Sequence, residues 1–346
     1  MRAVSVSVTL LGVVALAMIA ITQAEARGNI RIVGATTIYP YSVAVAKRFT
    51  SNEHAPMPEI VQNGTGDGVK QFCAGPGEDT PDIANGGRRI KPAELAECAK
   101  NGVTEVVELK IGYDAAVVTR SNGGPGFVPS ARDYWLALAA DVPIGGQMVP
   151  NPYKTWREVN PDLPAVAIKV VGQRTGNAIR ELFVEHVLSK GCADVPEIKA
   201  ISDKKLQKAA CETVRGDGPY IDIGDDQAKI VEEVTGDRNA LGVMSISMAD
   251  RNKAQLHSLP IEGVEPTYHS IAVGEYAMSR SLYLYVKKAH LSVIPGLREY
   301  LVEFASDSAS GYSGYLIEAG LLPLIEEERD ELARQVRVMD AMTSIN

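Results

Sequence analysis

The sequence predicts an α/β protein in which mixed, mostly parallel sheets carry helices on both faces and form two lobes. Short β-rich runs alternate with stretches of helical periodicity, a pattern typical of strand–helix–strand units. The chain of 346 residues exceeds the usual size of one domain, so two lobes are expected. Hydrophobic residues make up 45% and charged residues 23% of the sequence, which argues against a disordered chain and a multi-span membrane protein.

Residues 1–26 are expected to be a signal peptide. Arg2 supplies a short positive region, the stretch from Val8 to Ile21 is apolar, and Ala24-Glu25-Ala26 has the small-x-small spacing of a cleavage site. The apolar run of about 14 residues is shorter than the roughly 20 that a spanning helix needs. No cysteine lies near the cleavage point to carry a lipid. We therefore expect a soluble, exported protein without a lipid anchor.

Seven short runs are expected to form strands. They are Ile30–Val33, Glu59–Gln62, Val106–Ile111, Ala115–Thr119, Ala167–Val171, Leu241–Met244 and Leu282–Val286. Between them, helices are expected where apolar residues recur every three or four positions. Two such helical faces comprise Ile38, Tyr41, Val45 and Phe49, and Ile179, Leu182, Phe183 and Val187. The Pro-rich region 143–164 is expected to be a loop.

Three junctions share one design, in which a strand is followed by glycine with hydroxyl or amide residues and then by a helix start. They are 34–37, 63–68 and 172–177, and the segment 82–89 is a fourth candidate that carries two arginines. Unpaired N–H groups and the positive end of the helix dipole meet at such a place, which suits an anion. Each junction alone could be ordinary capping and turn chemistry. Because three similar junctions and a basic loop occur in one chain, we give a ligand site the same weight as ordinary capping and turn chemistry.

Other chemistries find no support in the sequence. The glycines at 64, 66 and 68 match neither a dinucleotide fingerprint nor a Walker loop, and no nucleophile is paired with a base. A net charge of −8 argues against nucleic-acid binding. We therefore expect no cofactor, no metal and no catalytic activity.

The four cysteines are expected to form two disulfides, because an exported chain with an even number of cysteines is typical of oxidised proteins. Sequence proximity favours Cys73–Cys98 and Cys192–Cys211 among the three possible connectivities. Each bridge of this loop size would contribute roughly 3 kcal/mol.

At these segments the chain resembles the phosphate-binding proteins of ABC-type phosphate uptake, which have the type II periplasmic binding-protein fold. Residues 33–40 resemble the family's opening Gly-Ser-Ser-Thr-Val-Tyr-Pro, and 63–68 resemble its Gly-Thr-Gly loop. Residues 82–88 resemble its Asp-Ile-x-x-Ala-Ser-Arg segment. The segments 149–156 and 274–282 also match, so the similarity runs in order over nearly all of the mature chain.

The resemblance implies two lobes that close on one dehydrated phosphate, lobe I being 27–114 with 276–346 and lobe II being 115–275. From the first lobe it implies as ligand-binding residues Thr36, Thr37, the Ile38 amide, Thr65, Gly66, Gly87 and Arg88. Some family members use an aspartate to accept the proton of hydrogen phosphate, and Asp67 is the nearest candidate for that role.

The third junction departs from the family pattern, which has Ser-Gly-Thr-Arg before this helix. An alignment without gaps from Phe183 places at these positions Asn177, Ala178, Ile179 and Arg180. A shift of two residues instead offers Thr175, Gly176 and Asn177, with Arg174 just ahead. We favour the shifted register because Ala178 and Ile179 have no side-chain donors, and Arg180 stays a candidate.

The expected function is a monomeric, non-enzymatic periplasmic receptor that binds inorganic phosphate and delivers it to the membrane subunits of an ABC permease. A receptor of the same fold for sulfate, tungstate, molybdate or a phosphonate is the main alternative, because the third junction is altered. A surface interaction protein with a degenerate cleft is a second alternative. A secreted phosphatase-like enzyme is disfavoured because the sequence has no metal or nucleophile constellation.

Overall fold

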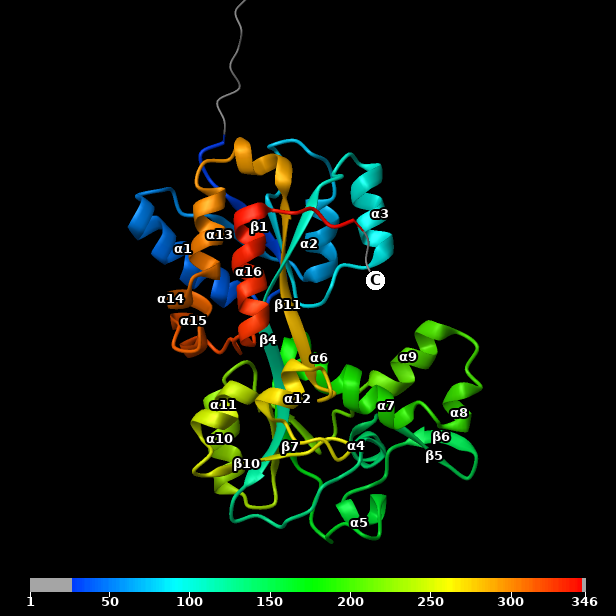
Figure 1. Ribbon diagram of the computed structural model, residues 1–346. Helices are drawn as coiled ribbons and strands as arrows, with labels where there is room; N and C mark the ends of the chain where they lie inside the picture. The colour runs from blue at the N-terminus through cyan, green and yellow to red at the C-terminus, as the bar shows by residue number, and fades with distance from the viewer. Residues whose placement is uncertain (1–26, 344–346) are drawn as a thin grey trace, which may run out of the picture.

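The computed structural model describes residues 27–343, so the expected signal peptide lies outside the described residues. The chain forms two lobes that are connected by two long strands, β4 (Val106–Ser121) and β11 (Ser279–Lys287) (Figure 1). These strands pair with each other in antiparallel fashion along most of β11. Together they belong to a continuous mixed sheet with the order β2-β1-β3-β11-β4-β9-β7-β8.

Lobe I, the upper lobe in Figure 1, contains the first three strands and the N- and C-terminal helices. The parallel strands are β1 (Arg31–Gly34), β2 (Glu59–Gln62) and β3 (Ile83–Gly86). Its helical elements are α1 (Tyr39–Glu53), α2 (Thr65–Phe72), α3 (Pro92–Lys100), the 3₁₀ turn η2 (Lys288–Ser292), α13 (Leu297–Ala305), α14 (Asp307–Ser310), α15 (Tyr315–Glu318) and α16 (Glu326–Val338).

Lobe II, the lower lobe in Figure 1, contains the middle of the chain. Its strands are β5 (Asp141–Ile144), β6 (Gln147–Pro150), β7 (Val170–Gly172), β8 (Tyr220–Asp222), β9 (Leu241–Ser245) and β10 (Leu256–Leu259). Its helical elements are α4 (Ala131–Leu138), α5 (Trp156–Val159), α6 (Ala178–Phe183), the π-helix η1 (Val184–Leu188), α7 (Ser189–Cys192), α8 (Pro196–Lys199), α9 (Lys204–Glu212), α10 (Gln227–Gly236), α11 (Ile246–Arg251) and α12 (Tyr268–Ala272). Strands β7, β8 and β9 are parallel, as β1 to β3 are in lobe I.

Two expectations about the elements are wrong. The expected strands Val106–Ile111 and Ala115–Thr119 are one strand, because pairing with β11 continues through the intervening residues. Gly112 lies in this stretch, and a Cβ there would come within 2.7 Å of the Leu322 carbonyl oxygen. The Pro-rich region expected to be a loop contains part of the β5–β6 hairpin and all of α5.

The two expected helical faces lie in the core, as predicted. Tyr41, Val45 and Phe49 are buried on α1, and Leu182 and Phe183 are buried on α6. These faces pack into one large apolar cluster that extends through both lobes. Within residues 27–343, no helix is both long and apolar enough to cross a bilayer.

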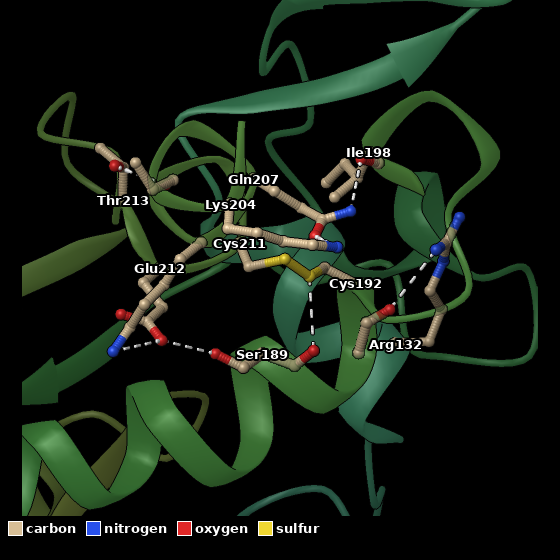
Figure 2. The surroundings of a disulfide bond; sticks show 12 residues. Arg132, Ser189, Cys192, Ile198, Lys204, Gln207, Cys211, Glu212 and Thr213 are labelled. Atoms are coloured by element: carbon tan, nitrogen blue, oxygen red, sulfur yellow. Dashed lines mark hydrogen bonds and ion pairs between the residues drawn. A yellow bond between two sulfur atoms is a disulfide. The ribbon is translucent and has the colours of Figure 1, made fainter. Parts of the chain in front are cut away.

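Both expected disulfides are present. Cys73–Cys98 links the end of α2 to α3, and Cys192–Cys211 links α7 to α9. Around the second bridge, Ser189 donates a hydrogen bond of 3.0 Å to Glu212, and the Gln207 side chain donates one of 3.0 Å to the Ile198 carbonyl (Figure 2). Each disulfide therefore joins two neighbouring helices of a single lobe.

Candidate functional site

The carboxyl ends of β1, β2 and β3 lie side by side, because these strands are parallel neighbours in lobe I. The turn after β1 leads into α1, and the turn after β2 leads into α2. The expected segments 34–37, 63–68 and 82–89 therefore end at one edge of the sheet. This is the edge where α/β proteins commonly bind ligands.

Two glycines allow α2 to approach this edge closely. A Cβ on Gly68 would lie 2.4 Å from the Cα of Gly34, so the helix backbone packs directly on the end of β1. Gly34 itself has a φ of 123°, and a Cβ there would lie 2.3 Å from the Asn85 carbonyl oxygen. The Gly34 carbonyl in turn accepts hydrogen bonds from the amides of Asn63 and Gly64. Glycine is thus required at both contact positions.

Thr37 and Thr65 each accept a hydrogen bond from the protein. The Thr65 hydroxyl accepts from the Gly87 amide at 3.0 Å, and the Thr37 hydroxyl accepts from the Arg280 guanidinium at 2.7 Å. A hydroxyl that accepts in this way still has its own hydrogen to donate. Neither hydroxyl donates to another group within residues 27–343. Both are therefore available as donors to a ligand.

Backbone amides add to these donors. Thr65, Gly66 and Asp67 form the first turn of α2, where N–H groups have no intrahelical acceptor. The Thr36 and Thr37 amides also have no hydrogen bond within the described part of the chain. This edge of lobe I therefore presents five unpaired amides and two hydroxyl donors next to two helix N-termini, which favours an anion.

Three expected ligand groups of lobe I are engaged elsewhere. The Ile38 amide donates to the Ala35 carbonyl at 3.1 Å and closes the first turn. The Gly87 amide is the donor to Thr65. The Arg88 guanidinium forms a two-point ion pair with Glu94, at 2.7 and 2.9 Å.

Arg280 is a candidate residue that the sequence analysis did not single out. It lies on β11 and is the register partner of Asp114 on β4. Its Nη2 donates to Asp114 at 2.8 Å as well as to Thr37. Arg280 falls within the segment 274–282 that carries the family resemblance, but only strand pairing brings it to the first junction. No local sequence pattern links it to Thr37.

The third junction lies at the corresponding edge of lobe II, between β7 and α6. Asn177 is the N-cap of α6, because its side chain accepts a hydrogen bond of 2.9 Å from the Ile179 amide. Its Nδ2 donates to Asp225 at 2.8 Å, and Arg174 donates to the same carboxylate at 2.8 Å. The hydrogen bond from Asn177, followed by that from Arg174, lowers the pKa of Asp225. Arg174 thus forms an exposed ion pair within lobe II.

Arg180 is also held by its own lobe. Its guanidinium lies 4.5 Å from the centre of the Tyr220 ring and donates to Asp222 and to the Gln173 carbonyl, both at 3.3 Å. The Gln173 side chain is fully buried, and neither of its polar atoms has a partner within residues 27–343. The expected cations of this junction are therefore both paired with aspartates.

The third junction lines a cavity of about 610 Å³ in lobe II. One wall is formed by α6 and η1, and the other by α9 with the residues after it. The lining residues are Thr175, Gly176, Arg180, Glu181, Val184, Glu185, Lys208, Glu212, Thr213 and Val214. The disulfide Cys192–Cys211 ties the α9 wall to α7, which follows η1 directly (Figure 2).

The two lobes also affect each other directly. The hydrogen bond with Glu94 raises the pKa of Arg88, and the charge of Glu185 on η1 adds a smaller effect in the same direction. On another side, the Tyr268 hydroxyl of lobe II donates to the Pro323 carbonyl of lobe I at 2.8 Å. The two junction-bearing edges thus belong to lobes that contact each other.

Comparison with known proteins identifies the family. The PBP superfamily domain matches residues 20–308. Protein SphX of Synechococcus elongatus is 27% identical over 80% of this chain and 73% of its own length. Phosphate-binding protein PstS of Staphylococcus saprophyticus is 23% identical over 89% of this chain and 84% of its own length.

Solved structures share the fold. A possible phosphate binding protein from Planctomyces limnophilus superimposes with a TM-score of 0.68 at 22% identity, covering 90% of this chain and 98% of that one. PstS from Borrelia burgdorferi gives a TM-score of 0.58 at 15% identity, covering 85% and 98%. The expected type II periplasmic binding-protein fold is thereby confirmed. The chain belongs to the PBP superfamily, a family of solute-binding proteins rather than of enzymes.

Proposed function

We propose that this protein is a periplasmic receptor that binds inorganic phosphate between its lobes and delivers it to the membrane subunits of an ABC permease. The observation that carries the proposal is the meeting of the first, second and fourth segments at one edge of lobe I. There, the hydroxyls of Thr37 and Thr65 accept hydrogen bonds from the protein and can donate to a ligand. Relatives named as phosphate-binding proteins support the same ligand.

The binding chemistry consists of hydrogen bonds to an anion that has lost its hydration shell. Amides of the first turn of α2 and the hydroxyls of Thr37 and Thr65 donate from lobe I. Thr175 and Gly176 donate from lobe II when the lobes close and exclude water. Hydrogen bonds to a charged acceptor are about twice as strong as neutral ones. The net charge of −8 does not oppose this, because nearby dipoles determine the local potential.

The lobes of the receptor comprise 27–114 with 276–346 and 115–275. This division places each boundary on or next to the strands β4 and β11, which pass between the lobes. The receptor acts as a monomer without lipid and catalyses no reaction. A receptor of the same fold for another oxyanion is the alternative, because the third junction departs from the family pattern and its two arginines pair with aspartates of lobe II.

Calorimetric titration of the mature protein with phosphate, sulfate, molybdate, tungstate and methylphosphonate tests the proposal. Phosphate is expected to bind and to raise the melting temperature, because a ligand that prefers the native state stabilises it. Binding of another oxyanion in place of phosphate would show that the ligand is wrong and that the receptor class is right. No binding of any oxyanion, and no melting shift, would contradict the receptor itself.

A matched pair of variants locates the site. Thr65→Val removes the hydroxyl at nearly constant volume and is expected to weaken phosphate binding. Thr104→Val makes the same change at an exposed position before β4 and is expected to leave binding unchanged. Equal affinities of the two variants would place the ligand elsewhere.

A further inference from the structure

Arg280 is fixed at the point where the two long strands cross between the lobes. It is paired across the sheet with Asp114, and the side chains are 18% and 6% exposed. Nε and Nη2 of Arg280 both donate to the same oxygen, Oδ2 of Asp114, at 3.3 and 2.8 Å. Opposite charges that face each other across strands stabilise the pairing, so the guanidinium has one defined orientation.

The hydrogen bonds of this guanidinium leave one side unused. Arginine has five N–H donors. Nε and Nη2 are engaged with Asp114 and Thr37, whereas Nη1 has no acceptor within residues 27–343. The two N–H groups of Nη1 are therefore available to a ligand.

Gly87 marks an open position beside Nη1. A Cβ on Gly87 would lie 3.8 Å from Nη1 of Arg280, 3.4 Å from the Thr65 hydroxyl oxygen and 3.5 Å from the Ala35 Cβ. Glycine leaves this position empty. Because glycine has no side chain, no side-chain atom of residue 87 blocks the approach of a ligand to the Thr65 hydroxyl and to Nη1 of Arg280.

The three arginines expected from the sequence offer no comparable donor at the lobe I edge. Arg88 is held by two bonds to Glu94, and it does not contact a hydroxyl of the junctions within the described residues. Arg174 and Arg180 lie on lobe II and are paired with Asp225 and Asp222. Arg280 alone among these four donates to a junction hydroxyl.

We propose that Arg280 supplies the cationic contact to the bound oxyanion, that Gly87 keeps the approach to this guanidinium and to Thr65 open, and that Asp114 is the positioning residue of the guanidinium. The inference rests on the proposed function, because it assigns a contact within the same site. Because Arg280 lies on β11, one of the two strands that connect the lobes, the proposed contact lies where the lobes are joined.

Gly87→Ala tests the open position without removing any donor. The added methyl meets its neighbours at ordinary contact distances, so the fold is expected to be retained. Phosphate affinity is expected to fall at least tenfold, because the methyl lies 3.4 Å from the Thr65 hydroxyl oxygen and 3.8 Å from Nη1 of Arg280 and obstructs the ligand's approach to both. Gly126→Ala is the matched control, since a Cβ there meets nothing within 4 Å, and its affinity is expected to equal that of the wild type.

The charge pair is tested by a double-mutant cycle. Arg280→Gln alone leaves Asp114 buried without its partner, which can unfold the protein. The double variant Arg280→Gln with Asp114→Asn replaces both charges by amides, so it leaves no unpaired buried charge and is the variant whose phosphate affinity is measured. Its phosphate affinity is expected to fall about 100-fold, the effect of losing a charged hydrogen bond.

Asp114→Asn alone separates positioning from a merely structural role. This variant is expected to lower phosphate affinity about tenfold. The double variant is expected to lose no more affinity than loss of the Arg280 contact alone explains, which is about 100-fold. A loss of affinity in Asp114→Asn, measured at a temperature where the variant is still folded, together with no greater loss in the double variant than loss of the Arg280 contact explains, indicates that Asp114 acts through Arg280. A gain of affinity in Asp114→Asn would contradict the positioning role.

The outcomes separate the two proposals. If the wild type binds no oxyanion, the proposed function fails. If the wild type binds phosphate while Gly87→Ala and the double variant bind it equally well, the receptor stands and this inference is overturned.

Discussion

The two lobes present the same local plan at their facing edges, yet they differ in which polar groups are free. In lobe I, the hydroxyls of Thr37 and Thr65 and the first-turn amides of α2 can still donate hydrogen bonds to a ligand. In lobe II, the side chains of Arg174 and Arg180 form ion pairs with aspartates at the end of β8 and after it. A strand, a glycine turn and a helix therefore do not by themselves define an anion site. The neighbouring turn decides which donors remain available.

The difference has a structural cause. At the lobe I turns, Gly34 and Gly68 bring the backbones together and have no side chains that could accept from Thr37 or Thr65. The neighbour of the lobe II turn is the segment after β8, which contributes Asp222 and Asp225. Lobe I thus keeps hydroxyl donors available at its edge.

The largest expected effect concerns the close contact of α2 with β1. Gly68→Ala places a methyl 2.4 Å from the Cα of Gly34, so backbone must move and the free energy of unfolding is expected to fall by about 3 kcal/mol. Gly176→Ala in lobe II is the comparison. It has φ of 82° and an open surrounding, and a loss of about 1 kcal/mol is expected. Urea unfolding measures both, and equal losses would remove the distinction between the two edges.

Removal of either disulfide is expected to lower the free energy of unfolding by a similar amount, but the two removals are expected to affect phosphate binding differently. Replacing Cys73 and Cys98 by serine, or Cys192 and Cys211, is expected to cost roughly 3 kcal/mol each. Only the first pair fixes α2, so only that variant is expected to weaken phosphate binding markedly at a temperature where both remain folded. Calorimetry on the folded variants is the measurement. A stronger binding defect from the lobe II pair would show that α2 contributes less to the site than the lobe II wall does.

The hydroxyl donors allow a direct comparison of the lobes. Thr65→Val is expected to weaken phosphate binding about tenfold, equivalent to roughly 1.4 kcal/mol. Thr175→Val, on the lobe II side, is expected to have a smaller effect because its turn is exposed and forms its contacts only on closure. Affinities that change by the same factor would indicate a symmetric site.

The smallest expected effect is the pH dependence of the lobe II turn. Hydrogen bonds from Asn177 and Arg174 lower the pKa of Asp225. Their contribution to stability is therefore fully present above the ordinary aspartate pKa of about 4 and is lost as pH falls through the lowered pKa. Asp225→Asn should flatten this part of the acid unfolding curve. An unchanged curve would mean that the exposed pair contributes nothing measurable.

Much of the fold could be predicted from local patterns. Apolar periodicity located α1 and α6, β-rich runs located most strands, and spacing favoured the two disulfides that are present. The break expected within β4 was wrong because Gly112 and Asp114 resemble a turn locally, whereas their pairing with β11 continues the strand. Local preference is weaker than cross-strand pairing at such a position.

The sequence by itself determined where helices begin after glycine turns, because those preferences depend on neighbouring residues along the chain. Only the tertiary structure decided which donors of these turns remain free. Gly87 uses its amide on Thr65, 22 residues away, and Arg280 reaches Thr37 across 243 residues. A hydrogen bond depends on the distance and direction of two groups in space, and sequence spacing does not contain that information for residues so far apart.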